Sequence, residues 1–429
     1  MLFLYNLVIY AVGFFLKIVA LFSPKIKLFI EGRKNVFSIL EEKIKPEDKT
    51  IWFHSASLGE YEQGLPVIEK IKEQFPSHKI IVTFFSPSGY EVRKNNTVAD
   101  ATVYLPLDTK ANAKRFLNLV HPEIAFFIKY EFWLNYLKEL EINKTPTYLI
   151  SGIFRDNQMF FKWYGGFYRK ALKAFTYFFV QNEKSKEKIE AIGFQNVVVS
   201  GDTRFDRVAA ILERDNTVDF INQFKNNTPT IVIGSSWPKD EALLAEYINQ
   251  TSENVKFIIA PHNIKQDQIL ALKSKITKST VLFSQKDSVQ DLSSYNVFII
   301  DTIGLLTKIY SYGTIAYVGG GFGNPGIHNV LEPATFGIPI LIGPNYSNFA
   351  EAVLLVELSG CMSISDEKEL KTLFDRLLTD EKFLENKSEI CKSYIQNNKG
   401  ATNCIMKIVL ETISKNHNSF FLNSEIKKE

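Results

Sequence analysis

Short apolar runs rich in β-branched and aromatic residues alternate along the chain with longer stretches of helical periodicity. Because these runs are apolar throughout, they predict parallel strands that helices cover on both faces. A polar stretch at residues 206–228 separates seven such runs from seven more. We therefore predict an α/β protein with two doubly wound, Rossmann-like domains. The predicted strands are residues 51–55, 79–85, 101–105, 124–128, 147–151, 177–181 and 197–200 in the first domain, and 230–235, 255–260, 280–284, 296–301, 314–319, 338–343 and 361–364 in the second.

The first 22 residues are an apolar stretch interrupted only by Asn6 and Lys17. This length suffices for a helix that crosses the hydrocarbon core of a bilayer. Positive charges follow the segment, which argues against a cleaved signal peptide and predicts a single anchor with the body on the cytoplasmic side. A helix that lies in the membrane interface and a helix buried in the first domain are the alternatives. The charges that follow are Lys25, Lys27, Arg33 and Lys34.

These patterns divide the chain into four parts. We predict a membrane anchor helix at residues 1–22, a first α/β domain at 23–215, a second at 216–414 and a polar tail at 415–429 that frays. Two facing domains of this class form a cleft at the carboxyl ends of their strands, where ligands bind.

The amino-acid composition limits the kinds of molecule that the chain is expected to bind. Fifty Lys and Arg residues against 47 Asp and Glu residues give a net charge of +3, too balanced for binding nucleic acid through global charge. The hydrophobic share of 45% and the charged share of 23% are ordinary for a folded soluble body. Cys361, Cys391 and Cys404 form no CxxC pair, so they predict neither a disulfide framework nor a metal site.

The first motif with candidate chemistry is HSASLGE at residues 54–60, between a predicted strand and a predicted helix. Gly59 lets the backbone turn closely, and Glu60 stands at the start of the helix, where the helix dipole stabilises an anion. Glu60 is therefore a candidate catalytic carboxylate. The alternative is a capping box formed by Ser57 and Glu60.

Three further motifs follow predicted strands of the first domain. Ser86 and Ser88 in the FSPSGY loop offer hydroxyls and backbone donors to a phosphate or a sugar, and a plain turn is the alternative. Glu131 places a second carboxylate at the end of the fourth strand. GDTRFDR at residues 201–207, which contains Arg204, is either a ligand contact or an internal Asp–Arg pairing that fixes the hinge.

In the second domain, Ser235 and Ser236 lead from a predicted strand into a helix and offer donors to a phosphate. The run VGGGFGNPGIHNVLEPATFGIPILIG at residues 318–343 predicts a glycine loop through Gly320 and Gly321. Glycine lets a phosphate or a sugar touch backbone N–H groups.

A helix is predicted to begin after this loop, around His328 and Asn329. Glu332 in its first turns is placed to accept both hydroxyls of a ribose. The spacing of the glycines is neither a dinucleotide fingerprint nor a Walker A motif.

Several of these motifs recur in one order in a known family. They are HSASLGE ending at Glu60, SPSGY ending at Tyr90, the E-x-W of Glu131 and Trp133, GDTRFDR ending at Arg207, DTIG ending at Gly304 and GIHNVLEPA ending at Ala334. Over nearly its whole length the chain resembles the 3-deoxy-D-manno-octulosonic acid (Kdo) transferases of Gram-negative bacteria. This resemblance implies a glycosyltransferase of the B fold, with two domains that face a cleft.

The resemblance implies inverting transfer of Kdo from CMP-Kdo to a tetra-acylated lipid A precursor, lipid IVA, with release of CMP. It places the reaction at the cytoplasmic face of the inner membrane, without a metal or another cofactor. Carried over onto this sequence, it makes Glu60 the general base that deprotonates the acceptor hydroxyl. The implied acceptor side comprises Ser57, Gly59, Ser86, Ser88, Glu131 and Arg204. The implied donor side comprises Ser235, Ser236, Pro261, His262, Gly320, Gly321, His328, Asn329 and Glu332.

The chain departs from the family pattern in two places. It has Pro261-His262-Asn263 where family members commonly carry Pro-Arg-His, so Lys265, His262 or Arg204 is expected to supply the cation near the phosphate. It also has Gly-Ile-His-Asn in place of the commoner Gly-Gly-His-Asn.

Aromatic and basic residues interleave at residues 153–177, which predicts a membrane-seated segment that admits acyl chains. A helix with a packed aromatic face is the alternative. For the whole chain, a UDP-sugar transferase or epimerase of the same fold and a membrane-tethered scaffold without activity remain the competing interpretations.

Overall fold

The computed structural model describes residues 2–252, 254–324 and 326–425. Met1 of the predicted anchor and residues 426–429 of the predicted tail lie outside the described residues. The chain divides into two compact units, Met1–Arg207 with Lys399–Glu429, and Val208–Asn398. The division therefore falls ahead of the predicted boundary at residue 216, and the C-terminal segment returns to the first unit.

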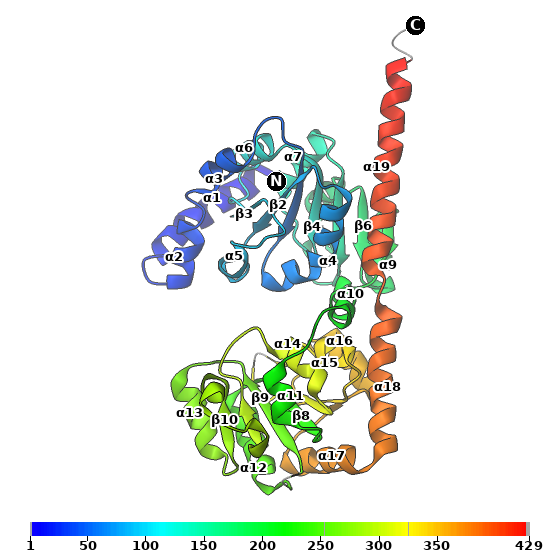
Figure 1. Cartoon of the computed structure of the whole chain (residues 1–429). Coiled ribbons are helices and arrows are strands. Elements are labelled where there is room, and N and C mark those ends of the chain that lie inside the picture. Colours follow the sequence, from blue (N-terminus) through cyan, green and yellow to red (C-terminus); the bar gives the residue numbers. More distant parts are fainter. Residues whose placement is uncertain (1, 253, 325, 426–429) are drawn as a thin grey trace. The chain divides into compact units, whose positions relative to one another are not determined.

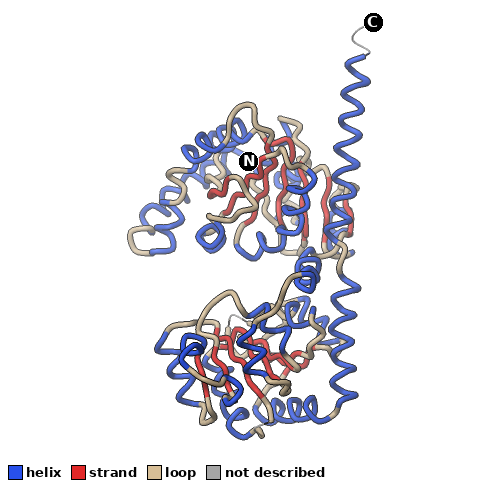
Figure 2. Tube along the Cα trace, in the orientation of Figure 1, coloured by secondary structure: helices blue, strands red, loops and turns tan. Residues whose placement is uncertain are grey.

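The first unit is built on a seven-stranded parallel sheet in the order β3-β2-β1-β4-β5-β6-β7 (Figures 1 and 2). Its strands are β1 (Thr50–Ser55), β2 (Lys79–Phe84), β3 (Ala101–Tyr104), β4 (Pro122–Ile128), β5 (Thr147–Gly152), β6 (Tyr177–Val180) and β7 (Val197–Val199). Its helices are α1 (Leu2–Val19), α2 (Pro24–Glu31), α3 (Val36–Lys43), α4 (Leu58–Gln74), α5 (Pro87–Arg93), α6 (Lys110–Val120), α7 (Leu134–Ile142), η1 (Met159–Phe161), α8 (Gly166–Leu172), α9 (Glu183–Ala191), α10 (Thr203–Ala209, which reaches into the second unit) and α19 (Ala401–Glu425).

Apolar residues cover both faces of this sheet because successive side chains of a strand point to opposite sides. On one face Trp52 packs against Phe116 of α6 and Tyr136 of α7, with ring centroids 4.9 and 5.7 Å apart. On the other face Phe53 stacks on Phe126 at 4.6 Å. Helices α4 and α19 complete the core on that second face.

The second unit repeats the plan, with a sheet whose strands Figure 2 draws in red. Its strand order is β10-β11-β9-β8-β12-β13-β14, again all parallel. Its strands are β8 (Thr230–Ser236), β9 (Lys256–Pro261), β10 (Thr280–Leu282), β11 (Val297–Ile299), β12 (Ile315–Val318), β13 (Ile340–Ile342) and β14 (Cys361–Ser363). Its helices are η2 (Ala210–Glu213), α11 (Asp219–Lys225), α12 (Pro238–Gln250), α13 (Gln266–Lys275), η3 (Phe283–Ser288), η4 (Leu292–Ser294), α14 (Leu306–Ile309), η5 (Tyr310–Tyr312), α15 (Leu331–Thr335), α16 (Ala350–Glu357), α17 (Glu367–Thr379) and α18 (Glu381–Asn398).

All fourteen predicted strands are present in the structure, with ends that differ by a few residues. The strands predicted at residues 296–301 and 338–343 are trimmed most, each by three residues, and at 280–284 β10 ends at Leu282 where the 3-10 turn η3 begins. Both sheets reverse their strand order beside the first strand of the unit, between β1 and β4 and between β8 and β12. Ligands of open α/β sheets bind outside the carboxyl ends of the strands at such a switch point.

Helix α1 is attached to the first unit by polar contacts. The hydroxyl of Tyr5 donates to Asp108 at 2.6 Å, and Asn135 donates to the side chain of Asn6 at 3.0 Å. The buried Gly13 lies against Leu107, where an added Cβ would come within 3.0 Å of the leucine methyl. Among the described residues α1 is the one helix long and apolar enough to cross a membrane, and most of its length is exposed.

The GDTRFDR motif anchors the C-terminal helix. Asp206 accepts hydrogen bonds from the backbone N–H and the hydroxyl of Thr402, at 2.6 and 2.7 Å, and from the N–H of Gly400. These donors precede or open α19, whose residues Ile405 and Val409 are fully buried in the first unit. The residues 415–425, which were predicted to fray, continue this helix.

Replacing Asp206 by Ala is expected to lower the free energy of unfolding by about 1–3 kcal/mol, since buried donors at the start of α19 lose their acceptor. Urea unfolding followed by circular dichroism measures this loss. Asp156→Ala removes an exposed carboxylate paired with Lys188 and is expected to leave the free energy of unfolding nearly unchanged. Equal effects of the two substitutions would contradict the anchoring role.

Candidate active site

Glu60 stands at the start of α4, directly after β1, and only 7% of its surface is exposed. The hydroxyl of Ser57 donates to its carboxylate, and the ammonium of Lys129 lies 3.7 Å from the other carboxylate oxygen. Ser57 occupies the N-cap position, yet its side chain makes no hydrogen bond to the helix backbone. The alternative of a capping box is therefore wrong, and Ser57 instead holds the carboxylate of Glu60.

The second carboxylate, Glu131, is held by residues at the ends of β1 and β4. The indole N–H of Trp133 is shared between Glu131, at 3.0 Å, and Nε2 of His54, at 2.8 Å. His54 is fully buried, and its Nδ1 lies 2.9 Å from the hydroxyl of Thr83. Because Nε2 accepts from the indole, Nδ1 is the nitrogen that donates to Thr83. A buried chain of hydrogen bonds thus fixes the position of Glu131.

The negative charges of both carboxylates affect the phenol of Tyr130, the residue directly before Glu131. The pKa of Tyr130 is raised, chiefly by burial and then by the negative charges of Glu60 and Glu131. Lys129 adopts a left-handed backbone conformation, with φ of 72°, which is uncommon for a residue other than glycine. The turn after β4 is therefore strained at the position that carries the cation beside Glu60.

The FSPSGY loop lies beside the HSASLGE loop. The backbone N–H of Ser86 donates to the carbonyl of Ala56 at 2.8 Å, and the hydroxyls of Ser86 and Ser88 lie 2.8 Å apart. An added Cβ at Gly89 would come within 3.0 Å of the backbone nitrogen of Leu58, so glycine allows the close approach of α5 and α4. These contacts bring Ser86 and Ser88 to the same edge as Glu60.

Arg204 forms the internal Asp–Arg pairing that was one of the two interpretations of the GDTRFDR motif. It donates to Asp202 through Nε at 2.9 Å and through a terminal nitrogen at 2.7 Å, and Gln63 donates to the same carboxylate at 2.7 Å. The internal pairing expected for this motif is therefore present at the end of the first unit.

The second unit has a pocket of about 270 Å³ at its own switch point. Ser235 enters it from a bulge in β8, where the pairing with β9 shifts and the serine backbone has φ of 52°. A bulge of this kind redirects a side chain beside a site. The residues that line the pocket are Ser235, Gly304, Leu306, Thr307, Tyr310, His328, Asn329 and Glu332.

Glu332 is held at both carboxylate oxygens. Thr307 donates to one oxygen at 2.8 Å, and the amide of Asn329 donates to the other at 3.1 Å. Burial raises the pKa of Tyr310 well above its ordinary value, and the charge of Glu332 adds to this shift. The helix α15 begins at Leu331, later than predicted, so His328 and Asn329 precede it.

The glycine loop after β12 serves mainly for close packing. The N–H of Gly320 donates to Asp240 at 2.9 Å, and an added Cβ at Gly321 would come within 2.6 Å of the backbone of Gly343. The N–H of Gly320, which was expected to face a phosphate, is thus used inside the protein. Ser236 is likewise buried, and its hydroxyl donates to Glu241 at 3.1 Å.

Three aromatic rings stack beside this pocket. His262 follows Pro261 at the end of β9 and stacks on Trp237 with centroids 4.5 Å apart, and it lies at the same distance from His328. The indole of Trp237 donates to Nε2 of His328 at 3.1 Å. Burial lowers the pKa of His262, and burial followed by the charge of His262 lowers the pKa of His328 to about 4. Both rings are therefore neutral near pH 7.

The structure places most of the predicted site residues in two groups, one beside β1 and one beside β8, whereas Arg204 pairs with Asp202 at the end of the first unit. Sequence reasoning gave no role to His54, Lys129, Thr307 or Tyr310. Lys129 and His54 lie at strand ends, close in sequence to predicted site residues. This position in the sequence could have identified them as candidates. Nothing local in the sequence marks Thr307 or Tyr310. In the described part of the chain, no three His, Cys, Asp or Glu residues gather as a metal site.

Replacing Trp133 by Phe is expected to lower the free energy of unfolding by about 1–3 kcal/mol, because His54 and Glu131 lose their shared donor. Denaturant titration of the purified protein measures the change. Trp163, which is 92% exposed, provides the control, and Trp163→Phe is expected to stay within about 0.5 kcal/mol of wild type. Indistinguishable stabilities of the two variants would speak against the hydrogen-bond chain.

Two parallel sheets, each with polar candidate residues at its switch point, define the glycosyltransferase B fold. UDP-GlcNAc 2-epimerase from Neisseria meningitidis is 15% identical, covers 84% of this chain and 100% of its own, and superimposes with a TM-score of 0.58. MurG from Acinetobacter baumannii is 12% identical, covers 85% of this chain and 99% of its own, and superimposes with a TM-score of 0.53. These two likenesses establish the fold.

Sequence comparison shows which known proteins the chain resembles. The family model of 3-deoxy-D-manno-octulosonic-acid transferase (kdotransferase) matches residues 32–207. The 3-deoxy-D-manno-octulosonic acid transferase of Aquifex aeolicus is 28% identical over 83% of this chain and 94% of its own, and that of Chlamydia trachomatis serovar D is 29% identical over 87% and 90%. These matches identify a glycosyltransferase that is similar to Kdo transferases over most of its length, and they support Kdo transfer in lipopolysaccharide biosynthesis.

Proposed function

We propose that this chain transfers Kdo from CMP-Kdo to lipid IVA, with inversion at the anomeric carbon and release of CMP. The observation that carries this proposal is the nearly buried Glu60, held by Ser57 and Lys129 at the switch point of the first sheet. A carboxylate fixed in this way suits the removal of a proton from an alcohol.

In this mechanism Glu60 accepts the proton of the acceptor hydroxyl. The alcohol oxygen forms a bond to the anomeric carbon of Kdo while the bond from that carbon to the cytidylate oxygen breaks. The electron pair of the broken bond leaves with CMP, and Glu60 retains the proton. Glu131, held by Trp133, positions a substrate hydroxyl beside the reacting groups.

On the donor side, Glu332 accepts the ribose hydroxyls, with Asn329 and Thr307 holding its carboxylate in place. The donor phosphate is met by the hydroxyl of Ser235 and by N–H groups of His262 and His328. Because Nε2 of His328 accepts from Trp237, its Nδ1 carries the proton and is the ring's donor. Neutral hydrogen-bond donors then replace the arginine of the commoner Pro-Arg-His pattern.

Mass spectrometry of lipid products tests this function. Purified protein is incubated with lipid IVA and either CMP-Kdo or UDP-N-acetylglucosamine, and nuclear magnetic resonance assigns the anomeric configuration of the product. We expect a Kdo-lipid product and released CMP with the first donor alone. Transfer from the UDP-sugar, or retention of configuration, would reject the proposal.

We also propose that the enzyme acts at the cytoplasmic face of the inner membrane, with α1 lying in the interface. Tyr5, Asn6 and Gly13 contact the first unit over much of the helix, and this is difficult to reconcile with a helix that leaves the body to cross a bilayer. A Phe3→Cys variant is expected to resist a membrane-impermeant maleimide in intact spheroplasts and to react with it in inverted vesicles. Labelling in intact spheroplasts would indicate a spanning helix.

A further inference from the structure

One hollow of the first unit is lined by none of the candidate site residues. It has a volume of about 840 Å³ and is formed by the start of α1 together with α7 and α8. Helix α7 begins at Leu134, shortly after Glu131, and lines the hollow from its first turn at Leu134 to its last at Glu141. The floor of the hollow is apolar and is formed by Leu2, Leu134, Phe167 and Ala171.

Charged side chains surround this floor. Lys138, Lys170 and Lys173 are all exposed at the hollow, and Glu141 is the acidic residue among its lining groups. The lining therefore carries an excess of two positive charges. Lysine binds phosphate as a point charge, and an apolar floor beneath ammonium groups fits an amphiphile with an anionic head.

The surroundings of the hollow are suited to lipid. Trp163 and Tyr164, which precede α8, are 92% and 50% exposed. Arg169 donates to the carbonyls of Phe160 and Lys162, and these bonds hold the aromatic loop against α8. Tryptophan and tyrosine are enriched at the level of lipid headgroups. The start of α1 adds the exposed side chains of Phe3, Leu4, Leu7 and Val8.

The other end of α1 has a smaller hollow of the same character. Its volume is about 490 Å³, and Lys17, Lys27 and Lys34 line it together with Leu21 and Ile30. Cationic hollows thus border both ends of an exposed apolar helix. This arrangement is expected for a helix that lies parallel to the membrane at the level of the lipid headgroups.

We propose that the hollow between α1, α7 and α8 binds the phosphate headgroup of an anionic phospholipid, with Lys138, Lys170 and Lys173 around the phosphate and the acyl chains along α1. This site is separate from the acceptor site, because the residues that line it exclude Glu60, Glu131 and the serine loops. The proposal rests on the membrane placement proposed above, and it is independent of the donor and acceptor assigned there.

The test compares three proteins in flotation assays with vesicles of phosphatidylcholine, with and without phosphatidylglycerol. The lysine variant carries Lys138→Gln, Lys170→Gln and Lys173→Gln, and Arg169 is left unchanged because it holds the aromatic loop. We expect this variant to bind phosphatidylglycerol vesicles on the order of 10- to 100-fold more weakly than wild type. Binding to pure phosphatidylcholine is expected to change little.

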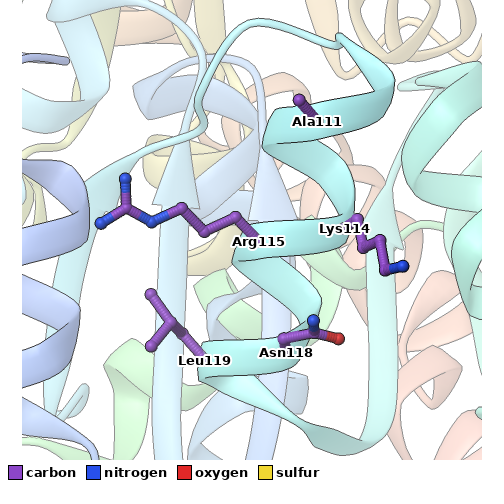
Figure 3. A pocket seen from close by; sticks show the side chains of 5 residues that line it. All are labelled: Ala111, Lys114, Arg115, Asn118 and Leu119. Carbon is purple, nitrogen blue, oxygen red and sulfur yellow. The ribbon is translucent and has the colours of Figure 1, made fainter.

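The matched control removes three exposed lysines elsewhere, by Lys114→Gln, Lys184→Gln and Lys368→Gln. Lys114 lines a hollow of about 380 Å³ whose side chains all come from the single helix α6 (Figure 3). The neighbouring Arg115 is paired with Glu41 at 2.9 Å. We expect the control variant to bind anionic vesicles like wild type. An equal loss in both variants would show a general charge effect and overturn the site.

A second variant, Ala171→Trp, fills the floor and keeps all three lysines. Native mass spectrometry of detergent-purified protein is expected to detect one retained anionic phospholipid in wild type and in the control, and none in either the filled or the lysine variant. Retention by the filled variant, or retention of the acceptor glycolipid in place of a phospholipid, would overturn the proposal. CMP binding by calorimetry is expected to be unchanged in all variants, so a failure here is distinct from a failure of the proposed function.

Discussion

Glu60→Gln is expected to lower kcat for Kdo transfer by about 10²- to 10⁴-fold, the usual contribution of a positioned general base. The amide has nearly the shape of the carboxylate and still accepts a hydrogen bond from Ser57, but it does not take a proton from the acceptor hydroxyl. A time course of Kdo-lipid formation under saturating substrates measures the change. The KM for donor is expected to stay within a few-fold, because the donor groups are assigned to the second sheet.

The same helix provides a control for this substitution. Glu73 is exposed near the end of α4 and pairs with Lys70 on the surface, so Glu73→Gln is expected to leave kcat unchanged. A Glu60→Gln enzyme with nearly full turnover and a native unfolding curve would remove Glu60 from the role of base. Another residue would then have to deprotonate the acceptor.

Glu332→Gln is expected to weaken CMP binding by about 10- to 100-fold, since a hydrogen bond to a charged group contributes about 1.5–3 kcal/mol. The carboxylate accepts from Thr307 and Asn329, and the proposed ribose contacts use its remaining lone pairs. Glutamine presents an N–H₂ group in place of one of these acceptors. Isothermal titration calorimetry with CMP measures the affinity without requiring turnover.

Glu357, which is exposed at the end of α16, provides the matched control in the same unit. Glu357→Gln is expected to bind CMP with wild-type affinity. Loss of affinity in both variants would point to a general effect of charge, and unchanged affinity in Glu332→Gln would place the ribose elsewhere. A native unfolding curve for each variant excludes loss of the fold as the cause.

The strand and loop positions follow from local pattern. Continuous apolar runs indicate strands buried on both faces, and this periodicity is visible without knowledge of any partner strand. In a parallel sheet all carboxyl ends lie at one edge, so Glu60 and Glu131 were predicted together from strand order along the chain alone. The candidate donor residues Ser235, His328 and Glu332 were found in the same way.

Only the tertiary structure decided the contacts between residues that lie far apart in the chain. Trp133 reaches His54 across 79 positions because β1 and β4 are neighbours at the switch point, and Asp206 reaches Thr402 across 196 positions because α19 returns to the first sheet. The capping-box spacing of Ser57 and Glu60 also gave no indication that the hydroxyl turns to the carboxylate. Periodicity and residue type determined which segments are strands and which loops carry polar groups. The choice of hydrogen-bond partner depended on which strands pair and how closely helices pack, since these bring distant donors and acceptors within bonding distance.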